Sequence, residues 1–344
     1  MNDATQADEG LAEFRPYRKL LVVCVPDKDN EETFTAATAL AKTWGASVSV
    51  LAVIEPLPDI NRISRATGAS REEILSRIMN DHRTETLATL GRTGPEIRPT
   101  IDVRIGKPFI EIVRYVLDHD IDIVIKSAEE LHGLHRHLFA STDQHLLRKC
   151  PCPVWLRRRG GLDSVRTILA AVDVDVAAAA EPETLTGLNR RILETATRIA
   201  ASGDDESRVC VLHAWDAPGE GLIRTWSGAA GAHKAATAYV DEVQSAHWRA
   251  LDRLVEHART WAGPDISKRV KFVPLLERGE ARDIIPAHVD TLKADTLVMG
   301  TIARSGVPGF IIGNTAEDIL NSVDCSVATV KPPDYVSPLH VDDR

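Results

Sequence analysis

The feature that most constrains this chain is an internal repeat. When the 344-residue sequence is shifted by 173 positions, a stretch of about fifty residues in one half aligns with a stretch in the other without a gap. The matched positions include turn glycines, apolar residues and a strand-leading aspartate, among them Gly106 with Gly279, Ile112 with Ile285, Asp122 with Asp295 and Cys152 with Cys325. A constant offset over about fifty residues of such different types predicts two copies of one domain.

Each copy alternates strand-like and helix-like segments. The first copy opens with the apolar run Lys19 to Val25, and the second opens with RTILAAVDVD from Arg166. Continuous apolar runs of this kind are typical of strands that are covered on both faces. Strands that alternate with helices form parallel sheets with right-handed crossovers. The sequence therefore predicts an α/β fold with two tandem, doubly wound, Rossmann-like parallel-sheet domains of about five strands each.

The expected boundary between the copies lies near residue 160, where RRGGLDS interrupts the periodicity with two glycines and charges. We expect a first domain over residues 1–160 and a second over residues 161–344. Because the linker is short, the two domains should pack closely together. The basic run Arg157 to Arg159 is interpreted as a solvated linker edge. The Pro-rich, acidic segment after Lys331 is expected to be extended and to lie on the surface.

Composition and motifs exclude several classes of function. The net charge is −9 and the longest apolar runs are strand-sized, so the sequence favours neither nucleic-acid binding nor a membrane span. The polar, acidic N-terminus does not resemble a secretory signal, and the five cysteines are an odd number, so we expect a cytoplasmic protein with reduced thiols. Cys150 and Cys152 lack the two-residue spacer of a zinc knuckle or redox pair. We find no nucleophile elbow, Walker loop, zincin helix or kinase signature, and we therefore expect no enzyme activity, no catalytic residue and no metal.

Candidate ligand-binding residues follow the fourth strand of the second copy, because ligands of open parallel sheets bind at the carboxyl ends of the strands. The segment VMGTIARSGVPGFIIGNT, residues 298–315, is rich in glycine. Glycines let the backbone approach a ligand, and the helix expected to begin at Asn314 and Thr315 offers N–H groups and a cap side chain to an anion. Arg304 lies in the same loop. The alternative is a tight loop and a helix cap that hold no ligand.

At these residues the sequence resembles the universal stress protein family, in its tandem, E-like type. Nucleotide-binding members carry G-x2-G-x9-G-[ST] after the fourth strand, and Gly300 and Gly313 match the first and third glycines at the required spacing. Ala303 replaces the second glycine, and Asn314 replaces the Ser or Thr. Asp173 matches the acidic residue that hydrogen-bonds adenine in the family. The segments FASTDQHLLRKCPCPVW, GNTAEDIL and CSVATVKPPDY carry the resemblance to the tandem type.

The resemblance implies a stress-response protein whose two domains pack as an intrachain pseudo-dimer. Such domains pair through their last strands, so PVWLRR and SVATVKP are the expected pairing edges. It implies an adenine nucleotide, ATP foremost, as the ligand of the second domain, although no cofactor is required. The residues expected to contact it are Asp173, Met299, Gly300, Ala303, Arg304, Gly313, Asn314 and Thr315. If the loop needs a positive φ at Ala303, this residue would cost about 1 kcal/mol and weaken binding.

The first copy has lost this pattern. Ser127 and Glu130 replace the first two glycines, and Val25 stands opposite Asp173. Carboxylates at Glu129 and Glu130 would repel phosphate at the place where an anion should bind. We therefore expect no nucleotide site in the first domain.

Three hypotheses for function stay open on the sequence alone. The favoured one is regulatory binding of a small molecule without chemistry, with protein partners or a homodimer to receive the signal. The others are a slow ATP-hydrolysing switch, and a carrier or sensor of an apolar or lipid-like ligand between the domains, with Trp215 and Trp226 covering the ligand or only packing. The loop His132 to His137 is interpreted as polar and exposed rather than metal-binding, and His213 as structural.

Overall fold

The computed structural model describes residues 15–25, 30–92, 98–129, 139, 141–158, 166–174, 176, 183–203, 205–226, 231–301 and 313–339. The first half holds β1 (Lys19–Cys24), α1 (Glu31–Trp44), β2 (Ser47–Ile54), α2 (Ile60–Thr67), α3 (Arg71–Arg92), β3 (Thr100–Ile105), α4 (Pro108–His119), β4 (Ile123–Ser127), α5 (Ser141–Lys149) and β5 (Val154–Arg157). The second half holds β6 (Thr167–Ala171), α6 (Glu183–Ala200), β7 (Ser207–Trp215), α7 (Glu220–Trp226), α8 (Ala232–Arg269), β8 (Val270–Arg278), α9 (Ala281–Leu292), β9 (Thr296–Gly300), α10 (Asn314–Leu320) and β10 (Ser326–Val330). The predicted α/β alternation is confirmed in both halves. Within the described ranges, no helix combines the length and the apolar character that a membrane span needs.

The strands of the described residues form one ten-stranded sheet in the order β3-β2-β1-β4-β5-β10-β9-β6-β7-β8. Each half contributes five parallel strands. At the centre β5 pairs antiparallel with β10, and Trp155 lies opposite Ala328. The predicted pairing of the last strands and the intrachain pseudo-dimer are therefore confirmed. Pairing covers the edges of β5 and β10, and the sheet ends instead at β3 and β8.

Helices cover both faces of this sheet. Helices α1, α6 and α8 pack on one face, with Phe34, Leu193 and Leu251 in its core. Helices α4, α5, α9 and α10 pack on the other face, with Ile112 and Ile319 in its core. Each core contains residues of both halves, so the two halves bury a shared apolar interior.

An aspartate repeated at the same place fixes the amino end of the first strand in each half. One carboxylate oxygen of Asp122 accepts hydrogen bonds from two successive backbone N–H groups at the start of β1, at 2.7 and 2.8 Å. Asp295 does the same at the start of β6, at 2.9 and 2.8 Å. The equivalence found by shifting the sequence thus extends to individual hydrogen bonds.

Two segments that were expected at the surface are buried in whole or in part. Arg157 and Arg158, expected in a solvated linker edge, are only 7% and 8% exposed. Arg157 ends β5, and its guanidinium lies 5.1 Å from the ring centre of Trp155. Both arginines are buried because β5 is an interior strand that the second half covers. The segment after β10 also departs from the expectation, because Lys331 and Ser337 are buried.

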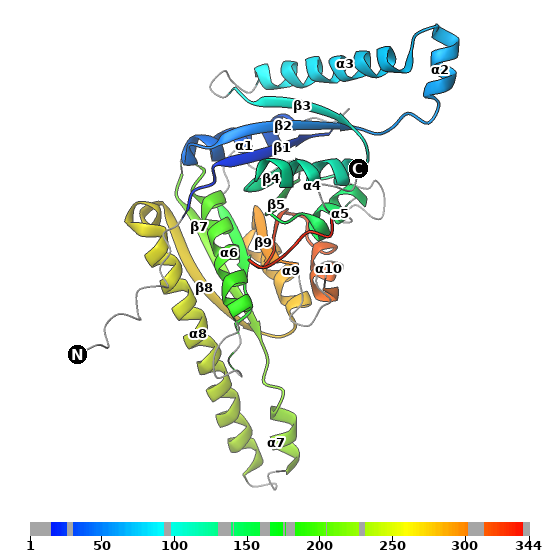
Figure 1. Ribbon diagram of the computed structural model, residues 1–344. Coiled ribbons are helices and arrows are strands. Elements are labelled where there is room, and N and C mark those ends of the chain that lie inside the picture. The colour runs from blue at the N-terminus through cyan, green and yellow to red at the C-terminus, as the bar shows by residue number, and fades with distance from the viewer. Residues whose placement is uncertain are drawn as a thin grey trace, which may run out of the picture.

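The second half carries a long helical arm. Helix α7 and the first part of α8 project away from the sheet as a hairpin, whereas the later part of α8 packs on the sheet (Figure 1). Helix α8 is interrupted at Gly263, where φ is 78°, and Pro264 follows. Trp226 at the end of α7 is 78% exposed, whereas Trp215 at the end of β7 is buried. The arm therefore exposes one of the two tryptophans that the sequence analysis considered as a ligand cover.

Candidate functional site

A cavity of about 460 Å³ lies at the carboxyl ends of β6 and β9 in the second half. The chain proceeds outward from β6 to β7 and β8 and returns to β9 on the other side of β6, so this is the point where strand order reverses. Such a point is the usual ligand site of an open parallel sheet. Six of the eight predicted residues line the cavity, namely Asp173, Met299, Gly300, Gly313, Asn314 and Thr315. Ala303 and Arg304 lie outside the described residues.

Asn189 of α6 holds the backbone of Asp173. Its side-chain oxygen accepts a hydrogen bond from the Asp173 N–H at 3.1 Å, and its side-chain nitrogen donates to the Asp173 carbonyl at 2.7 Å. Asn189 is buried and lines the cavity. These paired hydrogen bonds set the direction in which the chain leaves β6 and thereby position the Asp173 side chain.

Asn189 was not among the residues predicted from the sequence, although an asparagine on the apolar face of a helix is a weak signal for such a contact. The equivalent residue in the first half is Asn30, which is five positions after Val25, whereas Asn189 is sixteen positions after Asp173. The constant offset of 173 therefore does not align the two asparagines.

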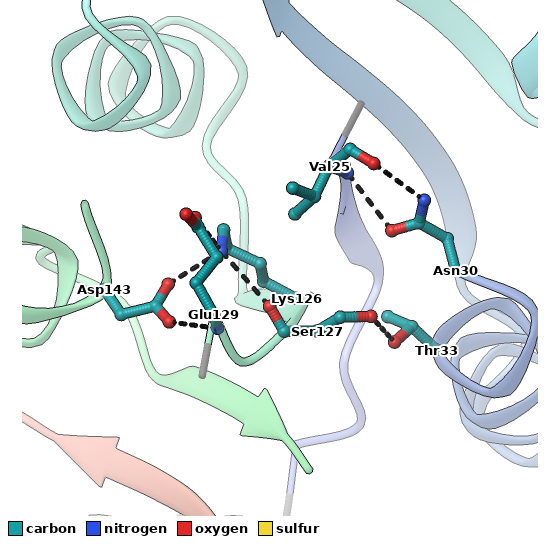
Figure 2. A network of polar contacts seen from close by, with 7 residues as sticks. All are labelled: Val25, Asn30, Thr33, Lys126, Ser127, Glu129 and Asp143. Carbon is teal, nitrogen blue, oxygen red and sulfur yellow. Dashed lines mark hydrogen bonds and ion pairs between the residues drawn. The ribbon is translucent and has the colours of Figure 1, made fainter. Parts of the chain in front are cut away.

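Gly300 allows a close approach between β9 and α6. A Cβ atom at this position would lie 2.9 Å from Cδ2 of Leu188. Leu188 also lines the cavity, so a larger residue at position 300 would displace part of its wall. In the first half Ser127 takes this position, and its Oγ lies 2.6 Å from Oγ1 of Thr33 in α1 (Figure 2).

Helix α10 begins at Asn314, and Gly313 is in the N-cap position without a side-chain cap hydrogen bond. The expected start of the helix at Asn314 is confirmed, but the expected cap side chain is not found, because the glycine before Asn314 takes the cap position. The N–H of Gly313 donates to the carbonyl of Thr301 at 3.2 Å. This bond joins the two ends of the loop 302–312, which lies outside the described residues.

The first half keeps the same framework. Asn30 holds the backbone of Val25 through the same two hydrogen bonds, at 3.1 and 3.0 Å (Figure 2). Val25 stands where the second half has Asp173, so the backbone contact is preserved while the acidic side chain is absent. A cavity of about 300 Å³ lies beside it, at the carboxyl ends of β1, β2 and β4.

A buried ion pair borders the cavity of the first half. The Lys126 amine donates to Asp143 at 2.7 Å and to Glu129 at 2.6 Å, and the other Asp143 oxygen accepts from the Glu129 N–H at 2.7 Å (Figure 2). Lys126 is 1% and Asp143 0% exposed. Burial raises the pKa of Asp143, and the charge of Lys126 opposes that rise. The second half has Met299 and Ala316 at the positions equivalent to this pair.

Other candidate residues lie outside the second cavity. His213 is buried, and its Nε2 lies 2.8 Å from Nδ1 of His247 in α8, which agrees with a structural role. Neither Trp215 nor Trp226 lines the cavity. The loop His132 to His137 lies outside the described residues. In the part of the chain that the structure describes, no group of three or more histidine, cysteine or acidic residues is placed to hold a metal ion.

The fold and the paired cavities define a class of tandem α/β proteins, in which two Rossmann-like units share one sheet and each forms a cavity at its carboxyl edge. The chain belongs to the universal stress protein family, whose model matches residues 16–158 and 166–331. It is 24% identical to universal stress protein E of Salmonella typhi over 332 residues, which are 95% of this chain and 98% of that protein. The resemblance to the tandem, E-like type is therefore confirmed.

Solved structures share the tandem fold. A functionally unknown protein from Pseudomonas aeruginosa PAO1 is 21% identical, with a TM-score of 0.60, and the match covers 93% of this chain and 95% of that chain. A universal stress protein from Archaeoglobus fulgidus DSM 4304 is 15% identical, with a TM-score of 0.59, and the match covers 94% of this chain and 98% of that chain. At these identities the likeness concerns the fold alone.

Proposed function

We propose that this protein acts in stress response by binding an adenine nucleotide, ATP foremost, in its second domain without chemical turnover. The observation that carries the proposal is a single cavity that gathers Asp173, Gly300 and Gly313 from separate segments at the carboxyl edge of the sheet. The proposal keeps a domain boundary near residue 160 and the cytoplasmic location expected from the sequence. A protein partner or a second copy of the chain would receive the signal.

In the proposed complex the adenine ring occupies the apolar part of the cavity. Val172, Leu188 and Ile192 line this part, next to Asp173. The Asp173 carboxylate would accept a hydrogen bond from the exocyclic amino group of adenine, and the contact with Asn189 would hold it in place. Apolar walls with a few placed polar groups are typical of small-molecule sites.

The phosphates in this proposal extend toward the loop between Gly300 and Gly313. Asn314 and Thr315 line the cavity there and offer side-chain donors. Ala303 and Arg304 belong to the same loop, and Arg304 would supply the positive charge that a polyphosphate needs.

The chemistry of the described lining supports binding without turnover. Among the lining residues that the structure describes, Asp173 is the only ionisable side chain. This proposal assigns it to the base, so it is not available to activate water at the phosphates. General acid–base catalysis requires a group within hydrogen-bond reach of the reacting atoms. The described lining thus gives no support to the ATP-hydrolysing switch.

Isothermal titration calorimetry of the full-length protein with ATP, ADP and AMP tests the proposal. We expect Asp173→Ala to weaken ATP binding about tenfold, the effect of one lost charge-assisted hydrogen bond. Ala303→Gly should strengthen binding because it removes a methyl group and frees the backbone. Val25→Ala is the matched control in the first half and should leave the affinity unchanged. If neither wild type nor Ala303→Gly binds any of the three nucleotides, the proposal is wrong.

The lining also favours a second candidate, an apolar or lipid-like ligand. Most lining residues of the larger cavity are aliphatic, including Ile192, Leu212, Ile285 and Ile319. The cavity lies within the second half, whereas the sequence analysis considered a site between the domains. Native mass spectrometry of gently purified protein would detect a co-purified apolar molecule, and Ile285→Asp should release it. A mass equal to that of the bare chain would count against a tightly bound lipid.

A further inference from the structure

The C-terminal segment, residues 331–339, completes a helix of the first half. Three of its side chains donate hydrogen bonds to the last three carbonyl groups of α5, which have no partner within the helix. The pairs are Lys331 Nζ with Leu147, Tyr335 hydroxyl with Arg148 at 2.7 Å, and Ser337 Oγ with Lys149 at 2.9 Å. In Figure 1 the red C-terminal segment reaches the green α5 of the other half.

The Lys331 side chain also contacts Thr301, the residue before the loop 302–312 beside the second cavity. The Lys331 amine donates to Oγ1 of Thr301, and this hydroxyl lies 3.4 Å from the Leu147 carbonyl, to which it donates. Thr301 is buried, and its own carbonyl accepts the N–H of Gly313. The Lys331 amine therefore connects the end of α5 with Thr301, the residue before the loop 302–312. The Thr301 carbonyl in turn connects the amine with Gly313, the residue after that loop.

The chemistry around Lys331 indicates that these hydrogen bonds are its role. Its side chain is buried, and its amine contacts among the described residues are a carbonyl, a hydroxyl and the Tyr335 ring at 5.3 Å. Burial lowers the pKa of Lys331 to about 7, and the Cys150 thiol opposes this shift. A methionine would fill similar space without the desolvation cost of an amine. The polar group is therefore explained by what it binds.

We propose that Lys331 is a positioning residue of the second cavity: it holds Thr301 against the end of α5 and thereby fixes the spacing between the two ends of the loop 302–312. Ligand binding in the second half then depends on its packing against the first half. Only the affinity part of this inference rests on the proposed nucleotide function. Asp143 lies on the same helix, so α5 connects this contact with the ion pair of the first cavity.

Hydrogen exchange in the ligand-free protein, followed residue by residue with NMR, tests the positioning role. Lys331→Met keeps the length of the side chain and removes its donors. We expect the Gly313 amide to exchange about fivefold faster, as the loss of one modest hydrogen bond predicts. Thr301→Val removes the same contact from the other side and should have the same effect. Ser337→Ala, the matched control, removes a cap from α5 without touching Thr301 and should leave Gly313 unchanged.

Calorimetry with ATP on the same variants tests the link to binding. Lys331→Met and Thr301→Val should weaken ATP binding about fivefold, whereas Ser337→Ala should not, although all three lose contacts of similar strength. An unchanged exchange rate of the Gly313 amide in either folded variant overturns the positioning role, whatever the affinity for ATP. Faster exchange with unchanged ATP affinity overturns the dependence of binding on the packing. Faster exchange in the variants, with no ATP binding in wild type, overturns the proposed function and supports the positioning role.

Discussion

The two cavities share a framework and differ in the charges that border them. In the first half, Lys126 and Asp143 form a buried ion pair. In the second half the equivalent positions hold Met299 and Ala316, and the carboxylate that lines the cavity is Asp173 at the end of the first strand. The same asparagine contact holds the backbone after that strand in both halves. A duplicated domain can thus keep its backbone geometry while one copy provides its own charges and the other leaves room for a ligand.

The difference explains why we expect only the second half to bind a nucleotide. In the first half, the Lys126 amine already contacts two carboxylates, those of Glu129 and Asp143. A phosphate entering there would meet two negative charges and an amine whose donors are in use. In the second half, Met299 and Ala316 place no charge at the same positions.

The largest expected effect comes from breaking the ion pair of the first half. Asp143→Ala removes the fully buried one of the two carboxylates that contact the Lys126 amine, and it should lower the free energy of unfolding by about 3 kcal/mol. The double variant Lys126→Met with Asp143→Ala installs the residues of the second half. Because well-packed apolar residues can replace a buried ion pair, it should regain most of the lost stability. Urea denaturation of the three proteins measures both differences.

A double variant as unstable as Asp143→Ala alone would show that the two halves do not tolerate the same residues at these positions. A loss below about 1 kcal/mol in the single variant would show that the pair contributes no more than an exposed one.

The second prediction concerns Lys331, which is buried like Lys126. The Lys331 amine contacts a carbonyl and a hydroxyl, whereas the Lys126 amine contacts two carboxylates. The folded-state pKa of Lys331, about 7, lies below its ordinary value of 10.5. The unfolded chain therefore binds more protons between these two values, and this group makes stability rise with pH above about 7, by at most about 1.4 kcal/mol per pH unit. Lys331→Met should remove this rise.

Urea unfolding of wild type and Lys331→Met at several pH values above about 7 measures the difference. The neighbouring ionisable groups are the Cys150 thiol, the Tyr335 phenol and Arg191, which donates a hydrogen bond to the Lys331 carbonyl. Burial raises the pKa of Tyr335 to about 12. All are present in both proteins, so the part of their titration that does not depend on Lys331 cancels in the difference. A difference that does not vary with pH would contradict a buried amine with a lowered pKa.

The asparagine contact allows a matched test of structure against binding. Asn30→Ala and Asn189→Ala each leave a backbone N–H and a carbonyl without their side-chain partner, and each should cost about 1–3 kcal/mol. Only Asn189→Ala should also weaken ATP binding, because only this asparagine positions Asp173. Urea denaturation and calorimetry separate the two effects. Equal loss of ATP affinity in both variants would mean that the two cavities are not functionally distinct.

The smallest effect concerns a backbone feature that the copies share. Asp120 and Lys293 follow helices α4 and α9, with positive φ values of 52° and 51°. Glycine adopts this conformation without steric cost, so Asp120→Gly and Lys293→Gly should each raise stability by about 0.5 kcal/mol. Thermal unfolding should show similar increases for both. Opposite signs would indicate that these equivalent turns differ in strain.

The fold could be predicted because its signals are local or repeated. Apolar runs bounded by helix-like segments predicted the strands, and the constant offset predicted two copies. The cavity of the second half could also be anticipated, because Asp173 and Gly300 end neighbouring strands of a parallel sheet. The fold and the place of the cavity needed only chain order and periodicity, whereas Asp173 itself was predicted from its match to the acidic residue of the family's nucleotide-binding members.

The remaining features depend on contacts between distant segments. The burial of Arg157 follows from the pairing of β5 with β10, which no property of the arginine itself predicts. Asn189 contacts Asp173 only because α6 folds back over the end of β6, after a connection longer than that of the first half. The place of Asn314 inside α10 rather than at its cap depends on the loop geometry, since a shift of one residue decides between a cap and a helical position.

The contact of the C-terminal segment with α5 has a consequence for synthesis. The first half leaves the ribosome with β5 as an open edge and with the last carbonyls of α5 without their partners. Its partners are β10 and residues 331–339, which are made only after the other strands of the second half. The β5 edge of the nascent first half therefore stays unpaired until nearly the whole of the second half has been translated. During this interval the chain is most exposed to aggregation.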